Sequence, residues 1–225
     1  MAQDDFQPLS DQIEMTILTF ISSVRSRTES EEISTRAAAW LMLEHYQFSM
    51  RNPSLLMRGA KMVETLRDQR ATCVLMENYH EEKDHSQIYR RGLLEHRVYV
   101  EERVPFPATD QFLDSLMTLI ESSPAHALGA LYATESAALL EHQIFNELSR
   151  KLSSERHIQY ESSVLAGFHG LHLAGVEEAH ARELRAFLQQ RHSELVPELL
   201  FDGARKAVES MNVWWKAMFA RIQTM

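Results

Sequence analysis

The chain has few of the residues that bend or cross-link a polypeptide. Its 225 residues include 7 glycines, 6 prolines and one cysteine, Cys73. A single cysteine excludes an internal disulfide, and the apolar neighbours of Cys73 predict that it lies in the core. So few glycines and prolines argue against many short strands and favour long helices with few turns. Val98–Val100 is the only strand candidate, and it is short.

Long hydrophobic runs and an excess of positive charge are missing as well. No apolar run approaches 18 residues, so we expect no transmembrane helix. The first residues, MAQDDFQPLSDQ, are acidic and polar and do not resemble a signal peptide. The formal net charge of -9 disfavours non-specific nucleic-acid binding, which needs a basic surface. We therefore expect a soluble, cytoplasmic protein that binds neither membranes nor nucleic acid.

What the sequence does contain is a series of amphipathic segments. Thr28 and Glu31 have the spacing of a capping box, which predicts the start of a helix. Asn52-Pro53 predicts the end of that helix. Helices are predicted over residues 11–25, 28–50, 54–68, 71–96, 109–122, 124–152 and 154–192, the last with a break, and in a final segment that opens at Pro197.

The longest connection runs from Arg97 to Thr109 and contains two prolines. We interpret it as a crossover inside one domain, because neither side of it carries a complete set of candidate ligands. Beyond it, Thr109 is predicted to cap one helix, and Ser123-Pro124 supplies the cap and first residue of the next. The sequence thus predicts an all-α fold in which residues 1–225 form a single helical-bundle domain.

Candidate metal ligands occur first in the run EEKDH, at residues 81 to 85. Glu82 and His85 are three apart, and Glu81 and His85 are four apart, so either pair would share a face of a helix. A Glu-x-x-His pair presents one oxygen and one nitrogen ligand to a metal in helix-bundle carboxylate sites. The run also fits a solvated charged face, because Lys83 and Asp84 lie alongside.

Two single carboxylates are further candidates. Glu135 is the only charged residue between Ala125 and Leu140, and a buried carboxylate needs a cationic partner or a metal. Alternatively, it faces solvent from an Ala-rich helix. Glu44 lies after an apolar stretch and is either a ligand or the polar end of an amphipathic helix. The nearby Glu141-His142 pair is assigned to a different helix face from Glu135.

The run with the most candidate metal ligands is HGLHLAGVEEAH. His169, His172 and His180 project within about one third of a turn of one another at ~100° per residue, and Glu177 falls at the edge of that sector. The alternative is that the histidines are ordinary core or surface residues. Three of the seven glycines of the chain lie in or beside this run, at positions 167, 170 and 175. Because each costs about 1 kcal/mol in a helix, they indicate a close approach or a local bulge.

Four motifs in this order resemble a known family: LEHYQFSMRNPSLL, NYHEEKDH, GALYATE and FHGLHLAGVEEAHA. The chain from about Glu32 to Phe187 is similar to the haem-oxygenase-like diiron oxidases, which share a fold with haem oxygenase, thiaminase-II-like and pyrroloquinoline-quinone-synthase-like proteins. The resemblance implies a seven-helix haem-oxygenase-like bundle that holds two Fe²⁺ ions and uses O2 as co-substrate. By motif, the implied metal ligands are Glu44, Glu82, His85, Glu135, His172, Glu177 and His180.

One motif departs from the family pattern. The family's last motif is H-x3-D-x2-H, whereas this chain has H-x4-E-x2-H. A bulge of one residue near Gly175 would restore the facing of the ligands, and the longer Glu177 side chain would help it reach the metal. The extra residue leaves His169 open as a substitute for His172.

The resemblance also implies a function. Similar proteins desaturate, decarboxylate, cleave C–C bonds or oxygenate amines, so we expect an O2-dependent oxidoreductase whose substrate is an amino acid or a fatty acid derivative. Arg36, Arg58 or Arg182 could anchor a substrate carboxylate. The sequence chooses neither the reaction nor between iron and manganese.

Three other hypotheses remain open at this stage. One is a metal-free relative of the thiaminase-II or pyrroloquinoline-quinone-synthase type, whose hydrolytic form needs a nucleophilic cysteine. Another is a haem-binding protein that uses His45. The third is a non-catalytic interaction protein without metal. The apolar face of the last helix, including Trp214-Trp215, also makes a homodimer an expectation.

Overall fold

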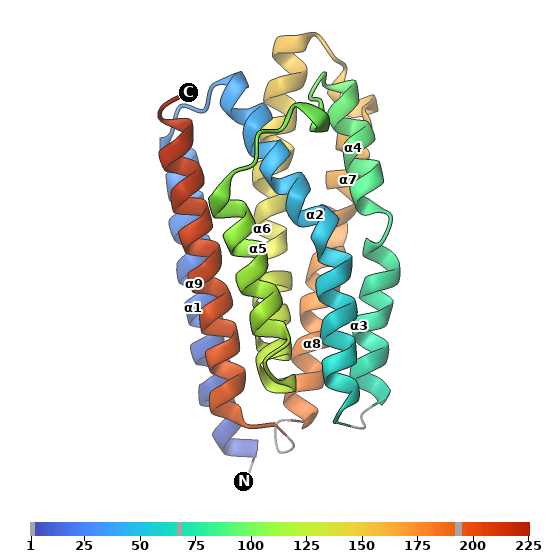
Figure 1. Ribbon diagram of the computed structural model, residues 1–225, viewed down its shortest axis with the longest axis vertical. Coiled ribbons are helices and arrows are strands. Elements are labelled where there is room, and N and C mark those ends of the chain that lie inside the picture. The colour runs from blue at the N-terminus through green and yellow to red at the C-terminus, as the bar shows by residue number, and fades with distance from the viewer. Residues whose placement is uncertain (1–2, 67–68, 192–194) are drawn as a thin grey trace.

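Long helices run side by side along the main axis of the molecule (Figure 1). The computed structural model describes residues 3–66, 69–191 and 195–225, and no strand occurs among them. The α-helices are α1 Gln3–Ser30, α2 Thr35–Glu64, α3 Gln69–Glu82, α4 His85–Glu95, α5 Pro107–Ile120, α6 Pro124–Arg156, α7 Val164–Leu171, α8 Glu177–Arg191 and α9 Pro197–Ile222. Two 3-10 helices, η1 Val100–Glu102 and η2 Tyr160–Ser162, and a π-helix, η3 His172–Val176, lie between them.

Two of the helical columns consist of two α-helices each. α4 continues above α3, and α7, η3 and α8 follow one another in a single interrupted helix (Figure 1). Counted in this way, the described part of the chain forms seven helical columns, and the predicted all-α, seven-helix fold is confirmed.

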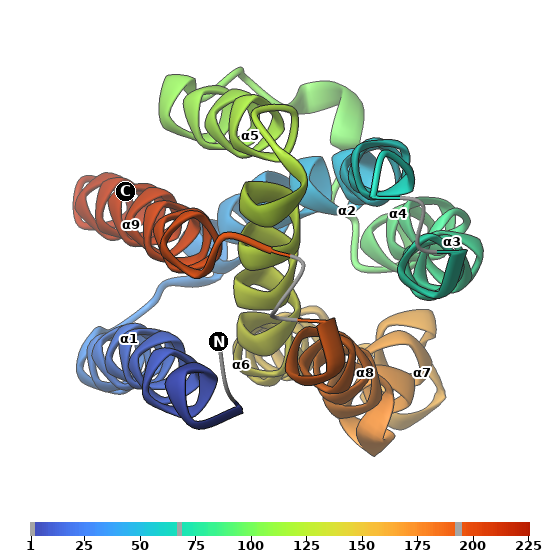
Figure 2. The same cartoon turned by 90° about the horizontal axis from the view of Figure 1, so that it is seen from below.

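α6 is the central helix of the bundle. It packs against α1, α2, α5, α7, α8 and α9, and the view from below shows it surrounded by them (Figure 2). Its closest approach is to α9, where a Cβ added to Gly203 would lie 2.6 Å from the carbonyl oxygen of His126. A Cβ on Gly129 would likewise collide with the backbone of Leu200. These two glycines allow the backbones of α6 and α9 to touch.

Several predicted helix boundaries are confirmed and others are wrong. Ser123 caps α6 by accepting a hydrogen bond from the backbone of His126, and α9 begins at Pro197. The capping box at residues 28 and 31 is not used, because α1 extends to Ser30 and Ser34 caps α2 instead. The predicted Thr109 cap is also wrong, since α5 begins two residues earlier.

The predicted stop at Asn52-Pro53 is wrong as well. α2 continues through Pro53, so the two helices predicted over residues 28–50 and 54–68 are one. Asn52, Leu55 and Leu56 are all buried, and their packing offsets the backbone hydrogen bond that a proline removes. Tertiary packing thus overrides the local signal.

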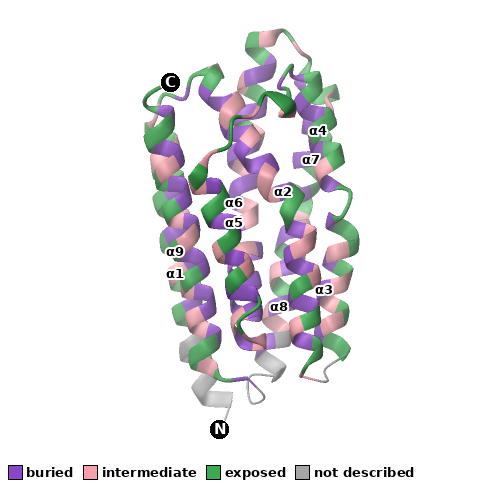
Figure 3. Cartoon of the chain, in the orientation of Figure 1, coloured by how far each residue is buried: buried purple, intermediate pink, exposed green. Residues whose placement is uncertain are grey.

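The apolar core receives buried side chains from every α-helix, most of them from α2, α5, α6 and α9, and buried residues occur along the length of the helices (Figure 3). Trp214 stacks on Phe112 with ring centroids 4.5 Å apart, and both tryptophans of α9 are 1% exposed. The apolar face of α9 is therefore used within the chain, which removes the observation that motivated the homodimer.

Cys73 is exposed on α3, so its predicted core position is wrong. None of the described helices is both long and apolar enough to cross a membrane.

Candidate metal centre

The other side of α6 holds an unusual concentration of buried ionisable side chains. They come from α2, α3, α4, α6, α7, η3 and α8, and they are Glu44, His45, Glu82, His85, Glu135, Glu141, His142, His169, His172, Glu177 and His180. Burying charges without partners costs several kcal/mol each. The distances within this group therefore indicate which of its side chains neutralise one another and which could bind a metal.

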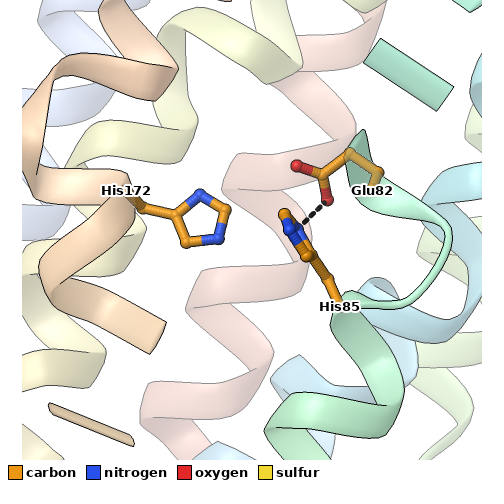
Figure 4. Close-up of side chains that lie close together, drawn as sticks. All are labelled: Glu82, His85 and His172. Atoms are coloured by element: carbon orange, nitrogen blue, oxygen red, sulfur yellow. Dashed lines mark ion pairs between the residues drawn. The ribbon is translucent and has the colours of Figure 1, made fainter. Parts of the chain in front are cut away.

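One triad of potential ligands consists of Glu82, His85 and His172, whose ligand atoms all lie within 4.8 Å of one another. Glu82 ends α3 and His85 begins α4, with two turn residues between them. The carboxylate of Glu82 lies 3.0 Å from Nδ1 of His85, and His172 points toward both from the opposite wall (Figure 4). The expectation that this pair shares one continuous helix is wrong, because the helix breaks between its members.

A second triad shares no residue with the first. Glu135, Glu177 and His180 also offer ligand atoms within 4.8 Å of one another. Glu135 comes from the middle of α6, while Glu177 and His180 lie three residues apart in the first turn of α8. Nδ1 of His180 lies 3.4 Å from Oε2 of Glu135. Six of the seven implied ligands therefore fall into two separate triads.

The two triads adjoin each other through Glu177. Its carboxylate is hydrogen-bonded to Nδ1 of His172, a member of the first triad. It also lies 3.4 Å from Nε2 of His142, whose ring stacks on that of His172 with centroids 3.9 Å apart. A carboxylate between two triads has the position that a bridging ligand needs.

His142 was placed on the wrong helix face by the sequence analysis. It lies seven residues after Glu135, and seven residues make nearly two full turns of an α-helix. His142, His172 and Glu177 form a third set whose ligand atoms lie within 4.8 Å. The seven-residue spacing was the signal that could have found it.

The predicted bulge near Gly175 is confirmed. Residues 172–176 form the π-helix η3, and Gly175 has a φ of 107°, a conformation that suits glycine. The extra residue brings His172 and Glu177 onto the same side despite their spacing of five. The other two glycines of the run, Gly167 and Gly170, have open space around them and support no close approach.

His169, the alternative to His172, points elsewhere. It is fully buried, and its Nδ1 lies 3.2 Å from Nδ1 of His142. Burial, with His142 and His45 nearby, holds the pKa of His169 well below its ordinary value. Among the described residues, it belongs to none of the three candidate ligand sets.

Glu44 is the one implied ligand that the structure keeps away from the triads. Its buried carboxylate accepts two hydrogen bonds from Arg103, at 3.0 Å from Nε and 2.8 Å from Nη2. This bidentate pair neutralises the charge without a metal. His45, the next residue, stacks on Phe145 with centroids 3.9 Å apart and lies 3.7 Å from Glu141.

Burial and neighbouring charges shift the pKa values of all three members of the second triad. Burial, together with the charges of Glu177 and Glu82, raises the pKa of Glu135 to about 7. Burial acts in the same direction on Glu177, but hydrogen bonds from His142 and His172 lower its pKa below the ordinary value. For His180, burial is outweighed by Glu135 and Glu81, which raise its pKa to about 10. The shifts of Glu135 and His180 both favour added positive charge in the second triad, which a metal cation could supply.

The unpaired atoms of the cluster fit a metal. Nε2 of His172 is buried without a hydrogen bond, and Nδ1 of His85 and of His180 face only the carboxylates of Glu82 and Glu135, without hydrogen-bond geometry. Lone pairs on imidazole nitrogens can be satisfied by a metal ion, and a mixed set of imidazoles and carboxylates suits iron or manganese. The chain thus supplies both the oxygen and the nitrogen ligands that a pair of such ions needs.

The space between these side chains is small. A largely enclosed cavity of ≈ 30 Å³ lies among His45, Glu82, Glu135, His142 and Glu177. A porphyrin needs a pocket of several hundred Å³. The space beside His45 therefore disfavours haem binding there.

The three arginines proposed as substrate anchors lie away from this cavity. Arg36 and Arg182 are exposed, and Arg58 forms an exposed ion pair with Glu121 at 2.5 Å. None of them is among the residues that line the cavity.

Comparisons with known proteins agree with this architecture. The family described as a domain of unknown function with a solved structure, DUF3865, matches residues 69–221. A CADD-like protein of unknown function from Nostoc punctiforme PCC 73102 is 20% identical, with a TM-score of 0.80 over 96% of this chain and 98% of the other. No curated protein matches the chain.

Two further crystal structures share the arrangement of helices. A domain of unknown function with a haem-oxygenase-like fold from Shewanella denitrificans OS217 is 17% identical, with a TM-score of 0.64 over 100% of this chain and 93% of the other. A TenA homologue from Pseudomonas syringae pv. tomato DC3000 is 13% identical, with a TM-score of 0.66 over 92% and 93%. At these identities the likeness concerns the fold, which is haem-oxygenase-like.

Proposed function

We propose that this chain, which belongs to the DUF3865 family, is an O2-dependent non-haem diiron oxidoreductase. The observation that carries the proposal is the pair of separate triads, Glu82, His85 and His172 on one side and Glu135, Glu177 and His180 on the other. Each triad combines imidazole and carboxylate, and Glu177 lies between them. Neither a solvated surface nor an apolar core needs this arrangement.

Each triad would hold one iron ion. When bound, the two ferrous ions would supply the electrons that reduce O2 and so allow the oxidation of a substrate. The protein holds the ligands in place: Asn52 donates a hydrogen bond of 3.3 Å to Glu82, and His142 faces Glu177. Such outer contacts orient ligands and tune their basicity.

The enclosed cavity determines what can reach the cluster. Phe48, Thr134 and Ala138 form part of its wall, and no lysine or arginine among the described residues lines it. A cavity of ≈ 30 Å³ limits the access of bulk water and leaves room only for the reacting end of a slender substrate. We propose a small-molecule substrate, an amino acid or fatty acid derivative, that undergoes desaturation, C–C cleavage, decarboxylation or N-oxygenation.

A metal-free hydrolytic relative is not favoured. That reaction was expected to need a nucleophilic cysteine in the pocket. Cys73, the single cysteine of the chain, is exposed on α3 and does not line the cavity.

The proposal is tested by counting iron per chain after anaerobic loading with ferrous iron and desalting. We expect about two irons per chain, and a loss in Glu135→Gln and His180→Ala because each removes a ligand of the second triad. Glu121→Gln and His126→Ala change the same residue types outside the cluster and should bind iron normally. Folded wild-type protein that binds no iron would sink the proposal. If iron binds, oxygen consumption with candidate substrates is measured next.

A further inference from the structure

A second pocket opens on the outer side of the second triad. It has a volume of ≈ 430 Å³ and lies between α3, η3 and α8. Three of the residues that line it are exposed glutamates, Glu77, Glu81 and Glu183, and none of the described residues in its lining is a lysine or arginine. The pocket is thus a negatively charged depression on the surface.

One imidazole separates this pocket from the buried cluster. Nε2 of His180 lies 2.8 Å from Oε2 of Glu81, whose side chain is 59% exposed. Nδ1 of the same ring faces Glu135 inside the second triad at 3.4 Å. His180 therefore connects a carboxylate at the surface with a carboxylate in the interior.

The inner end of the pocket also holds an unpaired polar group. Asn78 lines it and is 1% exposed, yet its Nδ2 has no hydrogen-bond partner. A buried amide without a partner costs about 1–3 kcal/mol, so a ligand that satisfied Asn78 would be favoured there. Because the two ends of an amide look alike, a half-turn of the side chain would present its oxygen to a cation.

We propose that this acidic pocket is the port through which divalent metal ions reach the cluster, and that Glu81 passes them to His180. The proposal rests on the proposed function, since it presumes a metal in the triads. The triads are buried, with Glu135 5% and Glu177 3% exposed, so an ion must pass a neighbouring side chain to enter. Carboxylates at an entrance concentrate cations and replace part of their hydration shell.

This port gives Glu81 and Glu82 different tasks. Glu82 is buried in the first triad, whereas Glu81 lies at the surface beside the second.

The test is the rate of metal entry, measured with Co²⁺ alone by stopped-flow visible absorption and followed by a count of cobalt per chain. The test variants are Glu81→Gln, Glu77→Gln/Glu183→Gln and the triple variant. The matched control is Glu29→Gln/Glu102→Gln/Glu147→Gln, which removes the same charge from exposed positions elsewhere. Glutamine keeps the shape of glutamate, so the fold should be retained.

We expect the triple variant to bind two Co²⁺ per chain but to take them up about tenfold more slowly at low salt, with a weaker dependence on ionic strength. The control should match the wild type. Unchanged rates in the triple variant would overturn the port while leaving the diiron proposal intact. Loss of one cobalt in Glu81→Gln would also overturn it, because Glu81 would then be a resident ligand. A wild-type protein that binds no cobalt and no iron would overturn both proposals.

Discussion

The two sides of α6 are packed with different chemistry. Toward α9, the contacts are aromatic rings and close backbones, with Trp214 stacked on Phe112 and Gly203 against the backbone of His126. Toward α2 and α8, the same helix presents Glu135 and His142 to a group of buried acids and imidazoles. The aromatic side is held together by its own contacts, whereas the polar side contains a buried imidazole nitrogen, Nε2 of His172, without a hydrogen bond.

The difference teaches how a small helical protein can hold a polar centre. The apolar side supplies stability that does not depend on any ligand. It can therefore offset the cost of the polar side, where carboxylate oxygens of Glu135 and Glu177 lie within 4.8 Å of each other. If this division is correct, mutations on the two sides should separate folding from metal binding.

The largest effect is expected from Trp214→Ala. The change removes a side chain that is 1% exposed and leaves the hydroxyl of Thr109 without the hydrogen bond that it accepts at 2.9 Å. We expect a loss of about 4 kcal/mol in the free energy of unfolding, measured by urea denaturation of the metal-free protein. The exposed Val213→Ala is the control and should change stability by less than about 0.5 kcal/mol. Iron per folded chain should be unchanged in both variants. A loss of iron in Trp214→Ala would contradict the separation of folding from metal binding.

Glu135→Gln should leave the stability of the metal-free protein nearly unchanged and should impair metal binding. In the metal-free protein, burial and the charges of Glu177 and Glu82 raise the pKa of Glu135 to about 7, which disfavours its charged form in the folded state. A carboxyl whose folded pKa is raised loses stability as the pH rises from about 4.5 to 7. We therefore expect the metal-free variant to stay within about 1 kcal/mol of the wild type at pH 7.5, or to exceed it.

The same variant should lose the stabilisation that metal confers. Ferrous iron at about 1,000 times its dissociation constant adds about 4 kcal/mol per site to the wild type, and Glu135→Gln should lack the share of the second triad. Thermal unfolding under anaerobic conditions with and without iron measures both quantities. Equal stabilisation of the two proteins by iron would show that Glu135 is no ligand.

A smaller effect is expected from Gly175→Ala. The φ of 107° is strained for alanine, so we expect a loss of about 1–3 kcal/mol, or a shift of the bulge that moves His172 away from Glu177. Gly170→Ala is the matched control: its surroundings are open, so it should be neutral or stabilise the helix by about 1 kcal/mol. Both variants are compared by urea denaturation and by counting iron per chain. Equal stability and equal iron binding would show that the conformation of Gly175 is not required.

The smallest effect concerns His96, a buried histidine outside the triads. Burial lowers its pKa, and both ring nitrogens are hydrogen-bonded, to the carbonyl of Gly92 and the hydroxyl of Ser153. Because the unfolded state then binds the proton more readily, this residue lowers stability as the pH falls from 6.5 toward its folded pKa. In His96→Gln, metal-free stability should depend less on pH between 7.5 and 5 than in the wild type. An identical pH dependence would show that His96 is not held neutral.

Part of the candidate centre was within reach of the sequence. The isolation of Glu135 in an apolar helix left burial and solvent exposure open, and the structure shows burial, while the glycine beside an overlong spacing predicted the bulge. His142 was missed although its spacing from Glu135 places both on one face of α6. Glu82 and His85 were paired for the wrong reason, since the break between α3 and α4 brings them together.

The sequence by itself determined that this protein is all-helical and which side chains along each helix could act together, because the helical period fixes how residues face one another. Only the tertiary structure decided which of those faces meet and which charges find other partners. Glu44 satisfies the same local criteria as Glu135, yet its carboxylate binds Arg103, which is 59 residues away in the sequence. Cys73 has apolar neighbours in sequence but faces outward. Whether a buried charge is neutralised by an arginine or left for a metal depends on contacts between distant segments, and no local pattern records them.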